Sequence, residues 1–301
     1  MPPSFEHRSV LLSEAIALLS PRPGGVVVDC TLGGGGHAEA ALNASAPVGR
    51  LIGFDRDPAA IAAASARLAP FGDRFTAVHS PFGDIGAHLA RLGVGRVAGV
   101  LADLGVSSPQ LDQAERGFSF GKDGPLDMRM DTTRGPSAAD LVNTLPEVEL
   151  ADLIFRFGEE RLSRRVARAI VAGRPFESTA QLADVVARAV GRSKDIHPAT
   201  RTFQAIRIAV NDELGELGRL MSALPSLLLP GGRAVIISFH SLEDRIVKHR
   251  FREFSGVGGD RDAYGQPLDA PRATLLTHRA VRASDDNPRA RSARLRAIQW
   301  L

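Results

Sequence analysis

The sequence predicts an α/β fold with a mostly parallel sheet, interrupted by a helical insertion. Over the first hundred residues, short apolar and β-branched runs alternate with helical patterns. With helices of about 10–15 residues, this alternation is typical of βαβ units with right-handed crossovers. From residue 107 to about 201 no strand pattern appears, and one returns at 229–241. We therefore expect a doubly wound domain in two parts, 1–106 and 202–301, with a helical domain at 107–201 between them.

Each element of the first part has a local justification. Pro58 suits the first turn of a helix, and Asp57 is placed to cap that helix. Apolar and β-branched runs predict strands at 24–30, 49–55, 74–80 and 96–105. Helical patterns predict helices between them at 37–45, 57–71 and 84–93.

The later elements are predicted in the same way. A stretch rich in Gly, Asp and Pro predicts a loop at 117–137. Amphipathic patterns predict helices at 150–173, 179–190, 202–228 and 241–254. The last of these has a start signal, because Ser241 followed by Asp244 resembles a capping box. The segments 273–281 and 293–301 predict a final pair of antiparallel strands.

Composition excludes several classes of protein. The 301 residues are 44% hydrophobic and 24% charged, which is ordinary globular usage and not that of a disordered or collagen-like chain. No apolar run reaches the ~18 residues of a membrane span, and the first ten residues lack the apolar run of a secretory signal. The single cysteine, Cys30, excludes an intramolecular disulfide. We expect a cytoplasmic protein with no membrane partner.

Basic residues are unevenly distributed, although the formal net charge is only +3. Residues 156–207 hold eleven Arg and Lys against five Asp and Glu, and residues 245–301 hold twelve against six. Such segregation is what a nucleic-acid surface needs, because phosphate contacts supply most of the sequence-independent affinity. Only three of the 37 basic residues are lysines, so a general preference for arginine is the alternative explanation.

A glycine-rich turn follows the first predicted strand. Gly33, Gly35 and Ala38 satisfy the pattern G-x-G-x-x-[GA]. Such a turn lets a ligand approach the backbone at a helix N-terminus, and a plain flexible loop is the alternative. Asp55 ends the next strand, twenty residues after Gly35, where an acid can accept hydrogen bonds from both hydroxyls of an adenosine ribose. The adenosine could belong to a nicotinamide cofactor, a flavin or S-adenosylmethionine.

Two further acids end predicted strands. Asp29 ends the first strand, four residues before Gly33, which is the usual S-adenosylmethionine pattern. Asp103 ends the fourth strand, at the same carboxyl edge of the sheet. Because a buried unpaired carboxylate is costly, acids at three strand ends favour a ligand site over plain sheet structure.

Longer motifs along the whole chain are specific enough to indicate a family. The chain resembles the RsmH (MraW) family of bacterial methyltransferases, which act on N4 of cytosine 1402 in 16S ribosomal RNA. The resemblance covers essentially the whole chain. It is carried by HRSVLL from His7, TLGGGGH from Thr31, DRDP from Asp55, LGVSSPQL from Leu104, ERGFSF from Glu115, DGPLDMRMD from Asp123, HPATRTFQA from His197, PGGR from Pro230, ISFHSLEDRIVK from Ile237 and NPRARS from Asn287.

The resemblance implies a class I S-adenosylmethionine-dependent methyltransferase with an inserted helical domain that recognises the substrate. It implies 16S rRNA or the small ribosomal subunit as partner, and it leaves a homodimer open. Gly34 departs from the family, in which a larger residue can stand there. The implied cofactor contacts are Gly35, Gly36, His37, Asp55, Phe82, Asp103 and Gln110.

Methyl transfer to an amine indicates further candidates. A hydrogen-bond acceptor beside cytosine N4 would raise its electron density and could then take a proton, and Asp103 is the candidate for this catalytic role. Binding the methionine part of the cofactor is its alternative role. Ser107, Ser108 and His240 are further candidates, with capping or turn roles as alternatives for the serines. No histidine pair has metal-ligand spacing, so we expect no metal site.

Candidates for RNA contact lie in the insertion, each with a structural alternative. Phe118 and Phe120, flanked by Arg116 and Lys122, could stack on bases or pin a loop to the core. Arg129 and Arg134 could meet phosphates, or form salt bridges with Asp127 and Asp131. Four arginines at helical spacing could form a basic stripe or a solvated helix face. They are Arg161, Arg164, Arg165 and Arg168.

Two other functions remain as alternatives. A nicotinamide oxidoreductase would bind NAD in the same crevice. A ribosome-associated module with an inactive cofactor site would retain RNA without transferring a methyl group.

Overall fold

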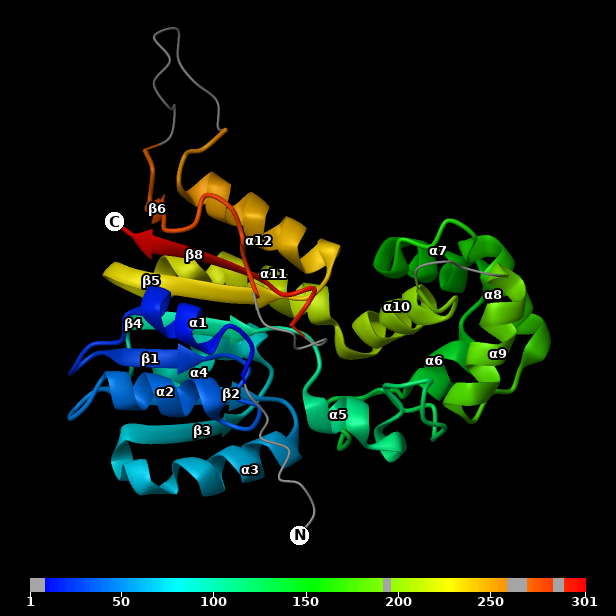
Figure 1. Cartoon of the computed structure of the whole chain (residues 1–301), viewed down its shortest axis with the longest axis horizontal. Coiled ribbons are helices and arrows are strands. Elements are labelled where there is room, and N and C mark those ends of the chain that lie inside the picture. The colour runs from blue at the N-terminus through cyan, green and yellow to red at the C-terminus, as the bar shows by residue number, and fades with distance from the viewer. Residues whose placement is uncertain (1–8, 192–195, 259–269, 284–289) are drawn as a thin grey trace, which may run out of the picture. The chain divides into compact units, whose positions relative to one another are not determined.

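The computed structural model describes residues 9–191, 196–258, 270–283 and 290–301. It contains an eight-stranded sheet with helices on both faces and a further group of helices, which confirms the predicted α/β class (Figure 1). The chain divides into two compact units. The first comprises Met1–Gly105 and Leu214–Leu301, and the second comprises Val106–Glu213.

The first unit contains the sheet. Its strands are β1 (Val26–Asp29), β2 (Arg50–Asp55), β3 (Phe75–His79), β4 (Val97–Asp103), β5 (Leu228–Ser238), β6 (Ala273–Leu275), β7 (Val281–Arg282) and β8 (Arg294–Trp300). Its α-helices are α1 (Leu12–Leu19), α2 (Gly36–Ala44), α3 (Pro58–Leu68), α4 (Ile85–Arg91), α11 (Glu213–Leu227, which begins at the boundary) and α12 (Ser241–Phe254). Two short 3₁₀ helices, η1 (Ala69–Arg74) and η2 (Phe82–Asp84), complete it.

The order of the strands locates the ligand crevice. The sheet runs β3-β2-β1-β4-β5-β8-β6, and β7 pairs with β8. The strands from β1 to β5 pair in parallel, whereas β8 is antiparallel to its neighbours. The direction of winding reverses between β1 and β4, and open α/β sheets bind ligands at the carboxyl ends of the strands at such a switch point.

Successive residues of the central strands pack on opposite faces of the sheet, as the period of two requires. Val28 and Val100 pack with apolar side chains of α4, α11 and α12. Val27 and Leu101 pack with those of α1, α2 and α3. Because both faces are covered, the strands are apolar along their length and polar side chains are concentrated at their ends.

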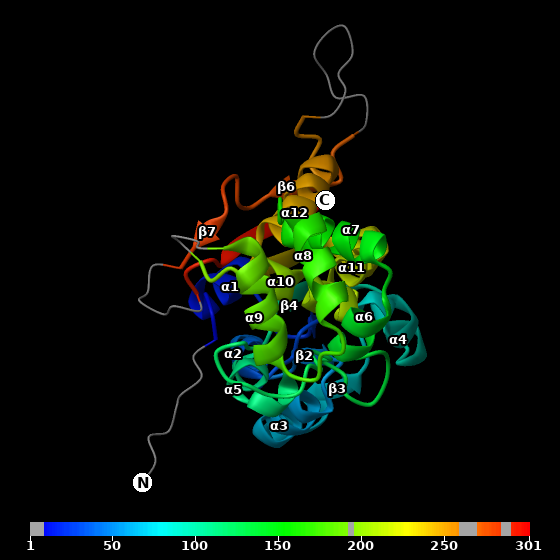
Figure 2. The same cartoon turned by 90° about the vertical axis from the view of Figure 1, so that its right-hand side faces the viewer.

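The second unit is helical and can be followed in Figure 2. It contains α5 (Ser108–Asp112), η3 (Ala114–Arg116), α6 (Ala138–Thr144), α7 (Glu147–Gly158), α8 (Ser163–Gly173), α9 (Thr179–Val190) and α10 (Thr200–Asn211). Phe203 and Ile206 of α10 lie in its core. The Asn211 side chain donates to the Met128 carbonyl and accepts from the Met130 amide, both at 2.8 Å. The unit therefore includes α10 and reaches Glu213, whereas we expected the insertion to end at 201.

Three local expectations were wrong in detail. The helix expected at 150–173 is two helices, because α7 ends at Gly158, Glu159 follows with φ of 51°, and α8 begins at Ser163. The helix expected at 202–228 is two helices, because Asp212 lies between them with φ of 47°, in the left-handed region that Asp tolerates. Helix α12 is capped by His240 and not by Ser241. The His240 ring accepts from the Glu243 amide, and the Glu243 carboxylate accepts from the His240 amide, which forms the capping box one residue earlier.

No helix in the described part of the chain is both long and apolar enough to cross a membrane.

Candidate functional site

Three carboxylates stand at the carboxyl ends of neighbouring strands. Asp29 ends β1, Asp55 ends β2 and Asp103 ends β4. Each follows an apolar strand that is held in register by its parallel neighbours. Burial is the main cause of the raised pKa of both Asp29 and Asp103, and the neighbouring charges add to it, Asp55 for Asp29 and Asp29 for Asp103. The predicted edge of acids is therefore a single electrostatic site within the first unit.

The glycine turn between β1 and α2 is shaped for close approach. Gly33 and Gly35 have φ of 51° and 79°, which residues with a side chain rarely adopt. A Cβ on Gly36 would collide with the Ser9 hydroxyl, whereas Gly34 faces open space. The departure from the family at Gly34 thus removes nothing that the turn needs. Gly35 is the N-cap of α2, so α2 presents its N-terminus at this turn.

Asp55 is held by backbone amides. Its Oδ2 accepts from the Gly33 amide at 2.8 Å and its Oδ1 from the Asp57 amide at 2.9 Å. Burial raises the pKa of Asp55, and these two hydrogen bonds oppose the rise. Each carboxylate oxygen can accept a second hydrogen bond. Asp55 is thus a fixed acceptor for two hydroxyl groups, and Asp57 caps α3 as predicted by accepting from the Ala59 amide.

Asp29 is almost completely buried, with 1% of its surface exposed. Its Oδ1 accepts from the Thr31 amide at 3.1 Å, and its Oδ2 has no hydrogen-bond partner in the described part of the chain. Burial raises the pKa of Asp29 to about 7. An unpaired carboxylate oxygen in such a place is costly unless a ligand satisfies it. Its chemistry fits a cation, such as the amino group or sulfonium of S-adenosylmethionine.

Asp103 faces His37, the second residue of α2. The Asp103 Oδ2 lies 3.8 Å from His37 Nδ1, and Oδ1 is buried without a hydrogen-bond partner among the described residues. Burial raises the pKa of Asp103 well above its ordinary value. The His37 Nε2–H donates to the Val10 carbonyl at 3.1 Å, so Nδ1 of the neutral ring is directed to Asp103. The pair can hold a proton at the edge of the crevice.

A buried glutamate supports the region around the predicted adenine residue, Phe82. Glu216 of α11 accepts from the Gly83 amide at 2.5 Å, directly after Phe82. Its other oxygen lies 3.4 Å from Arg56, directly after Asp55, and accepts from Arg219 at 2.6 Å. A side chain at Gly83 would meet this carboxylate. Glu216 thus joins the ends of β2 and β3.

Sequence reasoning missed Glu216, although a signal was present. In the helical pattern of α11, position 216 lies one turn before Leu220 and next to Leu217, both of which are buried. A carboxylate at a core-facing position of an amphipathic helix indicates a buried polar contact.

Three other predicted residues, Ser107, Gln110 and His240, have capping roles. Ser107 accepts from the Gln110 amide, and the Gln110 side chain accepts from the Ser107 amide, so the two form the capping box of α5 in the second unit. Ser108 is the first residue of α5. His240 caps α12 in the first unit. The structure thus brings Gly35, Gly36, His37, Asp55 and Asp103 together at one edge, while Gln110 belongs to the other unit.

The aromatic candidates for base stacking are used within the second unit. Phe118 is buried in its core, which favours the structural alternative over base stacking for this ring. Phe120 stacks on His197 with a centroid distance of 4.5 Å and meets the edge of Phe203 at 5.0 Å. Both rings therefore pin the 117–137 loop, as the structural alternative stated.

The arginine candidates divide into two groups. Arg129 and Arg134 form the salt bridges named as their alternative, with Asp127 at 2.7 Å and Asp131 at 2.6 Å. Arg161 of the stripe precedes α8, and its other three arginines lie on α8 opposite the buried face of that helix, with Arg168 3.6 Å from Glu147. All four arginines are exposed. They are Arg161, Arg164, Arg165 and Arg168.

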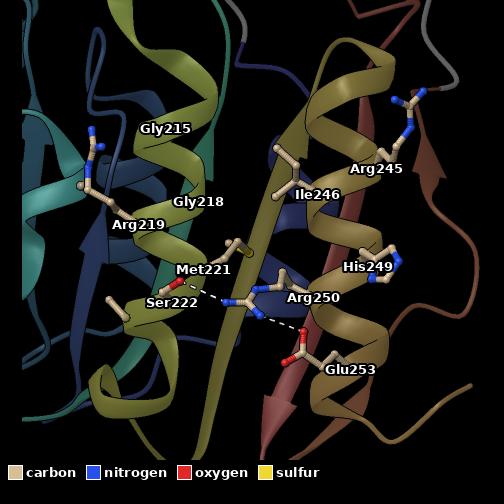
Figure 3. Close-up of a pocket in the computed structure, with 12 residues that line it drawn as sticks. Gly215, Gly218, Arg219, Met221, Ser222, Arg245, Ile246, His249, Arg250 and Glu253 are labelled. Atoms are coloured by element: carbon tan, nitrogen blue, oxygen red, sulfur yellow. Dashed lines mark hydrogen bonds and ion pairs between the residues drawn. The ribbon is translucent and has the colours of Figure 1, made fainter. Parts of the chain in front are cut away.

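A groove in the first unit does not coincide with the predicted site. It has a volume of about 1,050 Å³ and lies between α11 and α12, where Arg250 bridges Ser222 and Glu253 (Figure 3). None of the three strand-end acids lines it, and it reaches the predicted adenine region only through Gly83. The site is therefore assigned from the strand-end chemistry and not from cavity size.

Comparison with known proteins gives an independent result. The model of the MraW methylase family matches residues 4–301. Ribosomal RNA small subunit methyltransferase H of Geobacter sulfurreducens is 55% identical over 99% of this chain and 100% of its own length. The protein of the same name from Syntrophobacter fumaroxidans is 51% identical over 99% of this chain and 97% of its own length. An rRNA methylase structure from Streptococcus thermophilus has a TM-score of 0.43 at 11% identity, covering 96% of this chain and 93% of that one.

The match to the family model and the identity to these two relatives both extend over nearly the whole chain. They confirm the resemblance carried by the motifs, and this chain belongs to the MraW methylase family.

Proposed function

We propose that this protein transfers the methyl group of S-adenosylmethionine to N4 of cytosine 1402 in 16S ribosomal RNA. Membership of a methylase family and the names of its relatives support ribosomal RNA of the small subunit as the substrate. The position and the atom come from the family resemblance. A bacterial protein acting on this substrate works in the cytoplasm.

The observation that carries the proposal is the set of strand-end acids around the glycine turn. In the proposed complex, Gly35 and Gly36 lie against the cofactor, Asp55 accepts from its ribose hydroxyls, and Phe82 contacts its adenine. Asp29 fits the cationic methionine end, because its Oδ2 is buried without a partner in the described part of the chain. The remaining proposed contacts are His37, Asp103 and Gln110.

When bound, S-adenosylmethionine supplies an electrophilic methyl group beside a positive sulfur. With cofactor and nucleotide bound, Asp103 would accept a hydrogen bond from the cytosine amine, which would raise the electron density on N4 and orient it toward the methyl group. A nearby positive charge lowers the pKa of Asp103, so the carboxylate form becomes available in the complex. Asp103 then takes the proton released by the amine, with His37 as its neighbour.

The test begins with the product. Methylated nucleosides in 16S rRNA can be mapped by mass spectrometry in cells with and without the gene. N4-methylation at cytosine 1402 should be present in the cells with the gene and lost in the cells without it. Unchanged methylation would contradict the proposed function. In vitro, tritium transfer from labelled S-adenosylmethionine separates a methyltransferase from a module that only retains RNA, and reduced-NAD fluorescence tests the oxidoreductase.

Two variants test the residue roles. Asp55→Ala should weaken S-adenosylmethionine binding in calorimetry by about tenfold or more, because two hydrogen bonds to a charged group are lost. Asp84→Ala is the matched control, since Asp84 is exposed near Phe82 and makes no capping hydrogen bond. Asp103→Asn should lower the single-turnover rate, and a wild-type rate would remove Asp103 from the chemistry.

A further inference from the structure

A small cavity lined by arginines lies beside the first turn of α12. It has a volume of about 140 Å³, and three of the eight residues that line it are Arg282, Arg291 and Arg294. Ser241 and Ser292 also line it, and the lining contains no Asp or Glu. The cavity is thus strongly positive and offers both guanidinium and hydroxyl donors.

The sheet places two of these arginines directly opposite each other. Arg282 of β7 is the register partner of Arg294 of β8 in an antiparallel pair. Side chains of such partners lie on one face with Cβ atoms about 4.5–5.5 Å apart, and like charges at this distance destabilise a sheet. Asp244 offsets part of the charge of Arg294, but Arg282 adds a second guanidinium beside it, which favours an anion between the two side chains.

The carboxylate nearby is already shared. Asp244 of α12 is buried and accepts from Arg294 at 2.9 Å and from Arg296 at 2.7 Å. Arg282 and Arg291 are exposed, and no ion pair to either is found within the described ranges. The other carboxylate near the cavity, that of Glu243, accepts from the Phe239 and His240 amides. The charges of Arg282 and Arg291 are thus available to a ligand.

The position of the cavity relates it to the proposed reaction. Phe239, His240 and Ser241 line it, and they directly follow β5 at the carboxyl edge of the sheet. The neighbouring strand β4 ends at Asp103, in register with Ile237 of β5. The cavity therefore lies along the same edge as the strand-end acids, within the same unit.

We infer that Arg282, Arg291 and Arg294 bind a backbone phosphate of the RNA substrate, close to the nucleotide that is methylated. The inference rests on the proposed function and adds a phosphate site on the methyltransferase unit itself. Guanidinium groups bind phosphate oxygens through paired, charge-assisted hydrogen bonds. The phosphate also relieves the repulsion between Arg282 and Arg294, so binding is favoured by both contributions.

The test uses the full chain with Arg282→Gln and Arg291→Gln combined, which spares the Arg294 pair with Asp244. The control is Arg279→Gln, an exposed arginine between β6 and β7 that does not line the cavity. Affinity for a 16S rRNA fragment, measured at several salt concentrations, should fall by about tenfold. The slope of log affinity against log salt should become shallower by roughly 0.7 for each lost phosphate contact. The control should keep the wild-type values.

A second measurement uses inorganic phosphate as the probe. Phosphate should raise the melting temperature of the wild type and of the control, and raise that of the double variant less. Without phosphate, the double variant should be at least as stable as the wild type, because a like-charge pair has been removed. This comparison separates a lost ligand site from a damaged fold.

The outcomes separate the two proposals. If the wild type methylates the RNA, and the double variant matches the control in affinity, slope and phosphate response, the phosphate site is refuted. If an acidic peptide binds at the cavity while the double variant keeps the wild-type affinity for RNA, the phosphate site is also refuted, in favour of a protein partner. If the wild type neither binds nor methylates the RNA, the proposed function itself fails.

Discussion

Replacing Asp29 by Asn should change how stability depends on pH. In the wild type, burial raises the pKa of the folded Asp29 from 3.8 to about 7. Between these values the folded chain holds a proton that the unfolded chain has released, so the free energy of unfolding falls as pH rises. Above pH 7 both states are ionised and the loss is complete. Asparagine does not titrate, so the variant lacks this loss.

The magnitude follows from the size of the shift. About three pKa units at 1.36 kcal/mol each correspond to a loss of about 4 kcal/mol. The free energy of unfolding of Asp29→Asn, relative to the wild type, should therefore rise by about 3 kcal/mol between pH 5 and pH 8. The amide leaves an unpaired N–H where Oδ2 lay, at a cost of about 1–3 kcal/mol. This cost does not depend on pH, so only the change with pH tests the reasoning.

Urea unfolding at pH 5, 6, 7 and 8 measures this change. The single tryptophan, Trp300, is buried in β8 of the same unit and reports its unfolding by fluorescence. Asp84→Asn, at an exposed carboxylate, is the matched control and should follow the wild type. If Asp29→Asn and the wild type keep a constant difference across this range, Asp29 does not titrate near pH 7 and its assignment as a buried cation ligand loses its physical basis.

Three further predictions follow from the site. Glu216→Gln should raise the KM for S-adenosylmethionine by about tenfold with little change in kcat. The substitution weakens the contact that holds the Gly83 amide but does not change the reacting atoms. A tenfold fall in kcat at constant KM would contradict this positioning role. Reversing Arg164 and Arg168 to Glu should weaken binding of the ribosomal substrate and leave cofactor affinity unchanged, and two unchanged affinities would show that the α8 stripe is not the RNA surface. Cofactor binding near pH 7 should release protons as Asp29 ionises. Calorimetry in two buffers of different ionisation enthalpy detects this release. Equal heats of binding in both buffers would contradict ionisation of Asp29 on binding.

The sheet and its acids could be predicted because the signals are local. Short apolar runs ending in Asp29, Asp55 and Asp103 appear in the sequence as strands that stop at one edge. The cap at Asp57 and the glycine turn at Gly33 likewise depend on neighbours within a few residues. Local sequence patterns are enough to predict these features, and the structure confirms them.

Other features depend on contacts between distant segments. Glu216 reaches Gly83 across 133 positions of sequence, so no local pattern shows what it holds. The break at Asp212 interrupts a continuous helical pattern, and the neighbouring Asn211 hydrogen-bonds to Met128 and Met130 of the loop, which are distant in sequence. His240 replaces Ser241 as the cap because the buried Glu243 is directed to its amide, and burial of Glu243 is a tertiary property.

A crystal structure of the protein with S-adenosylhomocysteine, the product that keeps the adenosyl and methionine groups, would show directly whether the strand-end acids hold the methyl donor. We predict that the two ribose hydroxyls donate to the Asp55 carboxylate and that the methionine amino group lies beside Asp29. The backbone of Gly35 should lie against the same ligand. A ligand bound elsewhere, for example in the groove between α11 and α12, would contradict the central claim that the strand-end acids hold the methyl donor.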